Sequence, residues 1–231
     1  MGVRAGPGMR KSAAIRVWPT GRAVRAGQTT ACPRRPRLGK RAADIVLAAL
    51  LLVALSPVLL LAALAIRLDS PGPVLFRQTR VGWQGRRFRI LKLRTLRAPP
   101  GRPRAGAAQV LPGDPRITRV GRWLRRTSLD ELPQLVNVLR GEMSLVGPRP
   151  HALREDLCFA RMLPGYAARR QVRPGLTGPA QVNGCRGAVR NPQDLYRRTR
   201  HDLAYLSGRS ALGDLLILLR TVVSVVRAAG G

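Results

Sequence analysis

The sequence predicts an α+β protein, mostly helical, that is attached to one face of a membrane. A single long apolar run, Ile45–Ile66, is interrupted at its centre, and two short strand-like segments follow it. Basic residues dominate the 231-residue chain, with 42 Lys+Arg against 11 Asp+Glu and a net charge of +31. Such a charge predicts a polyanionic partner, which is a nucleic acid, an anionic membrane surface or a phosphorylated substrate.

Residues 1–39 contain many Arg, Gly and Pro and no acidic residue. No apolar period is visible, so this segment is expected to be a disordered basic tail that contacts anionic headgroups. It lacks the short apolar run and the cleavage site of a secretory signal.

The apolar run Ile45–Ile66 has 22 positions, and about 20 residues suffice to span a bilayer. Ser56 and Pro57 interrupt it at its centre, where a proline removes a hydrogen bond and kinks a helix. Basic residues flank both ends, and the positive-inside rule places such flanks on the cytoplasmic face. We therefore predict that residues 40–68 form a re-entrant membrane helix, broken at Ser56 and Pro57. A kinked helix that spans the membrane is the alternative.

Residues 69–231 are predicted to form a domain on the cytoplasmic face, beginning with a small β-hairpin. The hairpin strands are expected at Val74–Phe76 and Phe88–Leu93, with a turn around Gly82–Gly85. Residues 98–113 are rich in Pro, Gly and Ala and are expected to form a mobile loop.

The rest of the domain is expected to be mainly helical. Glu155 and Asp156 are interpreted as a solvated helix face, and Asp202 as an i,i+4 partner of Arg198. His151 and His201 are expected to be structural, and the three separated cysteines predict no disulfide framework and no zinc site. The expected elements are helices at Asp114–Arg126, Leu132–Arg140, Ala152–Leu163 and Asn191–Leu206, a strand at Ala180–Asn183 and an amphipathic helix at Leu212–Ala229 that lies at the interface or closes the core.

The adjacent acids Asp130 and Glu131 stand out in this basic chain. They invite two interpretations. Ser128 and Glu131 have the spacing of a capping box, and Asp130 alone would serve as an N-cap with Pro133 in the first turn. Alternatively, a carboxylate pair beside a basic field is a site where anions are gathered and a carboxylate meets them.

The order of motifs along the chain resembles one family. The chain resembles the bacterial sugar transferase family, the monotopic phosphoglycosyl transferases, exemplified by the undecaprenyl-phosphate glucose phosphotransferases. The resemblance covers residues 40 to about 229. It is carried by Ser56-Pro57, Gly72–Gln78, Arg80–Gly82, Lys92-x-Arg94-Thr95, Leu129–Leu135, Val146–Pro150, Pro174–Gly178 and Ala180–Gly184.

The resemblance implies a reaction and its participants. A UDP-sugar donates sugar-1-phosphate to polyprenyl phosphate at the cytoplasmic face of the bacterial inner membrane, and UMP is released. Asp130 is implied as the nucleophile and Glu131 as a ligand of Mg²⁺. A broken re-entrant helix is also implied, and no nucleic-acid partner is expected. The candidates for phosphate contacts are Lys92, Arg94, Arg126 and Arg149, because arginine and lysine neutralise a diphosphate.

The chain departs from the family pattern at Leu93, Leu96, Pro179 and Gly208–Ser210, none of which belongs to the acidic pair. A rival hypothesis is a non-catalytic basic protein that binds membranes or nucleic acid. It accounts for the charge, but it accounts neither for the acidic pair nor for the broken apolar run. An aromatic content of 4% also disfavours single-strand nucleic-acid binding, which stacks bases on rings.

Overall fold

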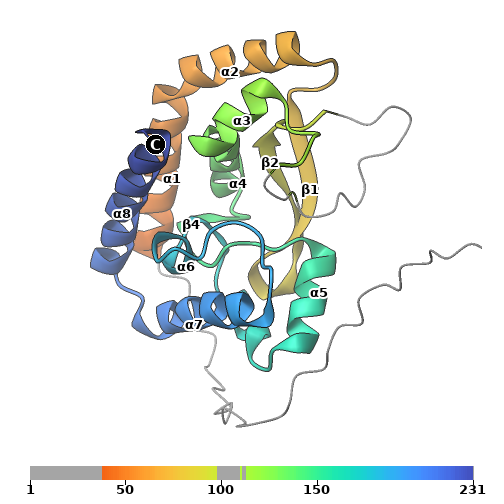
Figure 1. Cartoon of the computed structure of the whole chain (residues 1–231). Helices are drawn as coiled ribbons and strands as arrows, with labels where there is room; N and C mark the ends of the chain where they lie inside the picture. The colour runs from red at the N-terminus through yellow and green to blue at the C-terminus, as the bar shows by residue number, and fades with distance from the viewer. Residues whose placement is uncertain (1–37, 98–109, 111–112, 231) are drawn as a thin grey trace, which may run out of the picture. The chain divides into compact units, whose positions relative to one another are not determined.

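The computed structural model describes residues 38–97, 110 and 113–230, with side chains as far as Arg227. These residues belong to one compact unit within 32–231. Almost all of the predicted basic tail and most of the predicted loop at 98–113 lie outside the described residues. The longer helices surround two small sheets of two strands each (Figure 1).

The apolar run forms two helices, α1 (Leu38–Ala54) and α2 (Ser56–Asp69), which meet at an angle of 58°. Pro57 lies in the first turn of α2, where its missing N–H leaves no hydrogen bond unmade. The Ser56 hydroxyl donates to the carbonyl of Val53 at 2.7 Å. The predicted break at Ser56 and Pro57 is therefore confirmed. Within the described residues no single helix has the length and hydropathy of a membrane span, whereas α1 and α2 taken together do.

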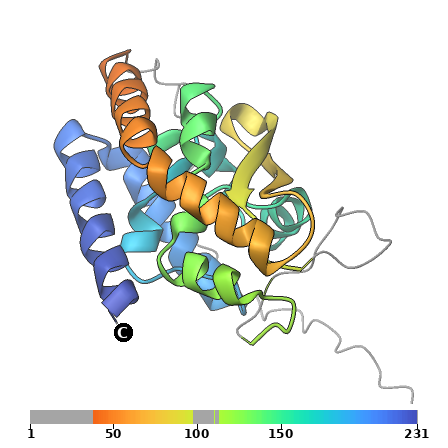
Figure 2. The same ribbon diagram turned by 90° about the horizontal axis from the view of Figure 1, so that it is seen from above.

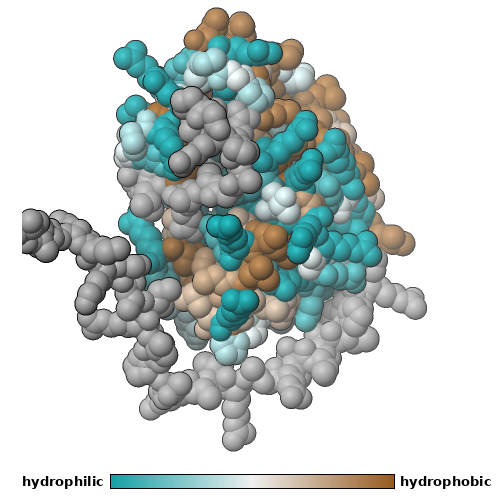
Figure 3. Space-filling model, turned by 90° about the vertical axis from the view of Figure 1, so that its right-hand side faces the viewer, coloured by the Kyte–Doolittle hydropathy of each residue, from teal (hydrophilic) through white to brown (hydrophobic). Residues whose placement is uncertain are grey.

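Most of the exposed large hydrophobic side chains lie on α1, α2 and the last helix, α8 (Ala211–Gly230). Helices α1 and α8 lie on the same side of the molecule (Figures 1 and 2), and Lys40 joins them by an ion pair with Asp214 at 2.6 Å. Figure 3 shows hydrophobic side chains gathered at the top of the molecule, where α2 lies. These helices thus leave an apolar surface exposed.

The predicted hairpin is present as β1 (Leu75–Val81) and β2 (Arg87–Leu93), with Leu75 opposite Leu93 and Val81 opposite Arg87. Its first strand continues five residues beyond the predicted end at Phe76. Helix α4 (Gln134–Leu139) docks onto β2 through Asn137. The Asn137 side chain accepts from the backbone N–H of Leu91 at 3.0 Å and donates to the carbonyl of Arg89 at 2.9 Å. This contact fixes the segment before α4 against the hairpin.

A second sheet pairs β3 (Ser144–Val146) in parallel with β4 (Gly175–Thr177). The predicted strand at Ala180–Asn183 was wrong, because Pro179 starts a short helix, α6 (Pro179–Val182). The backbones here are too close for side chains. A Cβ on Gly175 would lie 2.1 Å from the nitrogen of Gly147, which only glycine avoids.

The other helices begin and end near the predicted bounds, with one clear exception. Helix α3 (Arg119–Arg126) begins five residues later than predicted, because Thr118 caps it and Asp114 forms a separate turn with Arg116. The helix predicted at Leu132–Arg140 is the shorter α4. The remaining helices are α5 (Leu153–Met162) and α7 (Pro192–Gly208), the latter capped by Asn191 as predicted.

Two predictions about acidic residues were wrong. Asp156 is 2% exposed rather than solvated, and it accepts from the Tyr166 hydroxyl and from Arg170. Asp202 is also buried, and its ion pair is formed with Arg169 at 2.6 Å rather than with Arg198. Both carboxylates are buried because an arginine from the segment at 166–171 reaches them.

The core lies between α1, α4, β2 and β3, and it is built from Ala48, Ile90, Leu135, Val138 and Met143 among others. The buried Asp44 of α1 joins this core by polar contacts. It accepts from the Ser144 hydroxyl at 2.7 Å and from the backbone N–H of Leu145 at 3.2 Å. The apolar helix pair is thereby attached to the strand that leads to Arg149.

Candidate functional site

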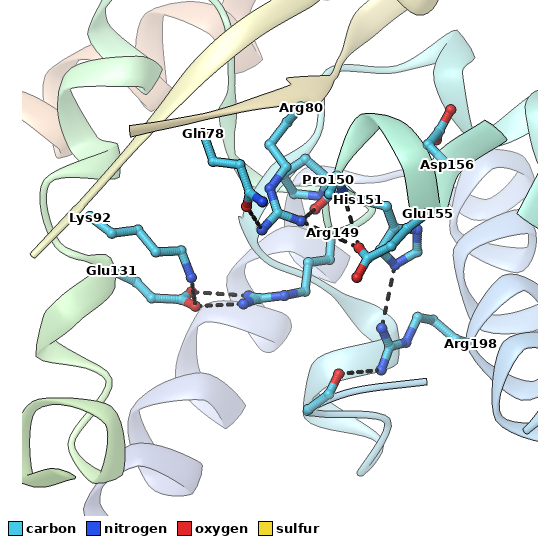
Figure 4. Close-up of polar contacts among 12 residues, drawn as sticks. Gln78, Arg80, Lys92, Glu131, Arg149, Pro150, His151, Glu155, Asp156 and Arg198 are labelled. Carbon is cyan, nitrogen blue, oxygen red and sulfur yellow. Dashed lines mark hydrogen bonds and ion pairs between the residues drawn. The ribbon is translucent and has the colours of Figure 1, made fainter. Parts of the chain in front are cut away.

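Glu131 is held between two cations that come from distant parts of the chain. Its Oε1 accepts from Lys92 Nζ of β2 at 2.8 Å and from Arg149 Nη2 at 2.5 Å, and its Oε2 accepts from Arg149 Nη1 at 3.0 Å (Figure 4). Arg149 therefore grips the carboxylate with two parallel hydrogen bonds. Three of the residues predicted for the site lie together in the fold.

The neighbouring carboxylate, Asp130, has a different environment. It is 8% exposed, and burial raises its pKa to about 6, with Glu131 adding to the rise and Lys92 opposing it. Burial alone also raises the pKa of Glu131, but Arg149 and Lys92 outweigh it and hold that pKa well below its usual value. The two adjacent acids therefore differ in charge below pH 6, because only Glu131 has cations against its oxygens.

The backbone that presents the pair is a tight turn. Ser128 has a left-handed φ of 59°, and the one-turn 3₁₀ helix Leu129–Glu131 follows it directly before α4. Ser128 makes no side-chain cap and Pro133 is the N-cap of α4, so the capping interpretations of Ser128 and Asp130 were wrong. The Glu131 side chain is thus free of any capping role and faces Lys92 and Arg149.

The structure places the other two predicted phosphate contacts differently. Arg94 is 4% exposed and donates to the carbonyls of Ile66, Ser70 and Pro71, where a cation suits the C-terminal end of α2. Arg126 is exposed in the last turn of α3. We assign Arg94 a structural role at the end of the apolar helix pair, and phosphate contacts by Arg94 and Arg126 stay predictions.

A buried network behind Arg149 was not found from the sequence. Arg169 donates to the carbonyl of Arg149 at 2.8 Å and is paired with the buried Asp202. His151 lies in the same network, in contact with Tyr166 and Arg169, and burial followed by Arg169 lowers its pKa well below its usual value. His151 is therefore neutral at physiological pH and has the structural role expected of it. The sequence carries only a weak signal for this network, because its members are up to 51 positions apart.

The residues present offer a small donor set for Mg²⁺. Among the residues that the structure describes, no group of three or more His, Cys, Asp or Glu side chains is placed to hold a metal ion. The two oxygens of Glu131 already accept from Lys92 and Arg149. Mg²⁺ is commonly held by one or two carboxylates together with substrate phosphates. Binding of Mg²⁺ by Glu131, with the substrate supplying further oxygens, therefore stays a prediction.

The sequence of the chain matches that of a known protein family. The model of the family described as bacterial sugar transferase matches residues 35–228. The chain belongs to this family. It is 55% identical over 189 residues to the UDP-glucose:undecaprenyl-phosphate glucose-1-phosphate transferase of Caulobacter vibrioides. The aligned residues are 82% of this chain and 70% of that protein.

Other relatives in the family differ in length. The Escherichia coli protein of the same name is 47% identical over 186 residues, which are 80% of this chain but 40% of that protein. The exopolysaccharide production protein PSS of Rhizobium leguminosarum is 45% identical over 195 residues, which are 83% of this chain and 97% of that protein. The chain therefore spans well under half of some relatives and nearly the whole of another.

Proposed function

We propose that the protein transfers sugar-1-phosphate from a UDP-sugar to polyprenyl phosphate, specifically undecaprenyl phosphate, and so initiates exopolysaccharide or glycoconjugate synthesis. The observation that carries this proposal is the buried Asp130 beside a Glu131 that Lys92 and Arg149 clamp. The names of the relatives support the substrate class.

Asp130 is the nucleophile in this proposal. Its ionised carboxylate oxygen attacks the phosphorus next to the sugar, and the bond from that phosphorus to the bridging oxygen breaks, so UMP leaves with the electron pair. A polyprenyl phosphate oxygen then attacks the same phosphorus, and the Asp130 carboxylate is released with formation of polyprenyl-diphosphate sugar. Covalent catalysis of this kind divides one transfer into two steps, so donor and lipid use the site in turn.

The neighbouring residues supply charge and position. Phosphoryl transfer depends mainly on positioning and on neutralising the phosphate oxygens. Lys92 and Arg149 stand on the Glu131 side of the pair and carry the positive charge that a diphosphate needs. Mg²⁺, when bound, would neutralise further phosphate charge, with Glu131 and substrate oxygens as its ligands. Arg169 and Asp202 hold the backbone of Arg149 in place from behind.

UMP release tests this mechanism directly. Membranes that contain the protein are incubated with a series of UDP-sugars, with and without polyprenyl phosphate. Without the lipid, a covalent intermediate predicts a burst of about one UMP per enzyme. Asp130→Asn should abolish both the burst and turnover, whereas Asp114→Asn, in a turn remote in sequence from the pair, should retain them. Full turnover by Asp130→Asn would remove the nucleophile assignment.

The membrane attachment is proposed to be re-entrant, at the cytoplasmic face of the bacterial inner membrane. The 58° bend between α1 and α2 and their exposed apolar side chains support it. Single cysteines replace Leu38 and Leu68, which are 81% and 80% exposed at the two outer ends of the helix pair. Both should react with a membrane-impermeant reagent from the cytoplasmic side only. Labelling from opposite sides would support a spanning helix instead.

A further inference from the structure

A second basic pocket lies apart from the Glu131 clamp, between the loop after α6 and the first half of α7. Its volume is about 250 Å³. Four arginines and one aspartate line it, which gives a net charge of +3, together with small residues of the loop and Cys185. The charged members are Arg186, Arg190, Asp194, Arg197 and Arg198.

Arg198 is the buried member of this pocket, with 4% of its surface exposed. Its Nη2 donates to the carbonyl of Gly187 at 3.0 Å, and its Nη1 lies 3.3 Å from His151 Nε2 (Figure 4). Its Nε is buried and has no hydrogen-bond partner within the described part of the chain. A buried donor without a partner is unfavourable, so an acceptor that reached this guanidinium group would stabilise it.

The single acid of the pocket offsets only one of the four arginine charges, and its side chain is bonded to backbone at the start of α7. Asp194 Oδ2 accepts from the backbone N–H of Arg190 at 3.1 Å, and the Asp194 N–H donates to Asn191 at 2.8 Å. Burial lowers the pKa of Arg198, and its like-charged neighbours Arg149 and Arg169 add to this. Arginine binds phosphate through paired, charge-assisted hydrogen bonds. The unbalanced charge therefore suits a phosphate-bearing ligand.

We propose that this pocket is a second anion-binding site, which takes a phosphate group of a soluble phosphate compound. The group is either the nucleotide part of the sugar donor or a free phosphate. The assignment of the ligand as the donor nucleotide rests on the proposed function. The assignment of a phosphate group as the ligand does not rest on it. In Figure 1, α7 lies at the opposite end of the molecule from α2, which favours a soluble ligand over the lipid phosphate.

The pocket is also joined to the Glu131 site. Arg198 contacts His151, and His151 is two residues from Arg149, whose guanidinium holds Glu131. An anion that binds Arg198 would therefore change the contact of Arg198 with His151. His151 belongs to the segment 149–151, which positions the Arg149 guanidinium against Glu131. This contact gives the pocket a route by which its ligand affects the transfer site.

Alkylation of Cys185 reports on this pocket in the intact protein. The full chain, in detergent or in membranes, is treated with the neutral reagent iodoacetamide, and each cysteine is followed by mass spectrometry. Inorganic phosphate or UMP should slow the reaction of Cys185 about tenfold at saturation. Cys158, which is exposed and outside the lining, is the internal control. Sodium chloride at equal ionic strength should have no such effect.

A double variant assigns the protection to the pocket. Arg190→Gln with Arg197→Gln changes two exposed lining residues and should raise the phosphate concentration for half-protection by at least about tenfold. Arg200→Gln removes an exposed arginine of the same helix outside the lining and should leave protection unchanged. Absence of any protection by phosphate and UMP would overturn the proposal, as would equal protection of the double variant and the wild type.

Kinetics separates the two sources of the phosphate. A higher KM for the UDP-sugar in the double variant, with kcat retained, would identify the ligand as the nucleotide of the donor. Loss of protection with an unchanged KM would identify a separate phosphate site. A wild-type chain that shows protection of Cys185 but no transfer with any UDP-sugar would refute the proposed function and leave the pocket standing.

Discussion

Replacing Asp130 by asparagine should remove transfer and at the same time stabilise the fold above pH 6. The folded chain holds a proton on Asp130 up to a pKa of about 6, whereas an ordinary aspartate releases it near 3.8. Between these values the folded chain binds more protons than the unfolded chain, so its stability falls as the pH rises. The difference corresponds to about 3 kcal/mol at 1.36 kcal/mol per unit, fully expressed above pH 6.

Thermal unfolding measures this effect on purified protein at pH 4 and pH 8. For a chain of this size, about 3 kcal/mol raises the unfolding temperature of Asp130→Asn by about 6–12 °C at pH 8, and most of this gain should be lost at pH 4, close to the ordinary pKa of 3.8. Asp114→Asn is the matched control, because Arg116 lowers the pKa of Asp114 to about 2 and its removal should bring no gain. An equal or lower unfolding temperature for Asp130→Asn at pH 8 would refute the reasoning.

Further predictions concern the same site. The rate of transfer should fall as the pH drops through about 6, because protonated Asp130 is no nucleophile, and a rate that stays flat down to pH 5 would contradict this. Arg149→Lys keeps the charge but loses the paired contact with Glu131, and kcat should fall about 10- to 100-fold in a UMP-release assay, with wild-type turnover as the contrary result. Tyr166→Phe leaves buried polar partners unpaired and should reduce the free energy of unfolding by about 1–3 kcal/mol in denaturant titrations, whereas an unchanged midpoint would argue against the network.

Local signals in the sequence predicted those elements whose cause is local. The bend between α1 and α2 follows from Ser56-Pro57 within a long apolar run, and the start of α7 follows from Asn191-Pro192. The three residues of strand β4 carry no local sequence signal of this kind. They form a strand only because they pair with Ser144–Val146. The close contact of Gly147 with Gly175 that permits this pairing joins residues far apart in the chain.

The candidate site was predictable only in part for a related reason. Lys92, Glu131 and Arg149 were proposed from motifs, and the fold brings them together. In a chain with 42 Lys+Arg, however, the residue type does not distinguish an arginine that holds a carboxylate from one that holds carbonyls, as Arg94 does. Burial of Asp202 depends likewise on Arg169, which lies 33 positions away.

The buried contact of Asp44 limits how deeply the proposed membrane hairpin enters the bilayer. Because Asp44 bonds Ser144 and Leu145 in the protein core, the first two turns of α1 belong to the catalytic unit and not to the lipid. The arm from Ile45 to the bend has ten residues and a length of about 15 Å at 1.5 Å per residue, but Ala48 within it is buried in the core, so the hairpin enters the bilayer by less than one leaflet. The contacts of Asp44 with Ser144 and Leu145 then fix the distance between the membrane surface and the Asp130–Glu131 pair. A lipid phosphate has to reach the site at this distance.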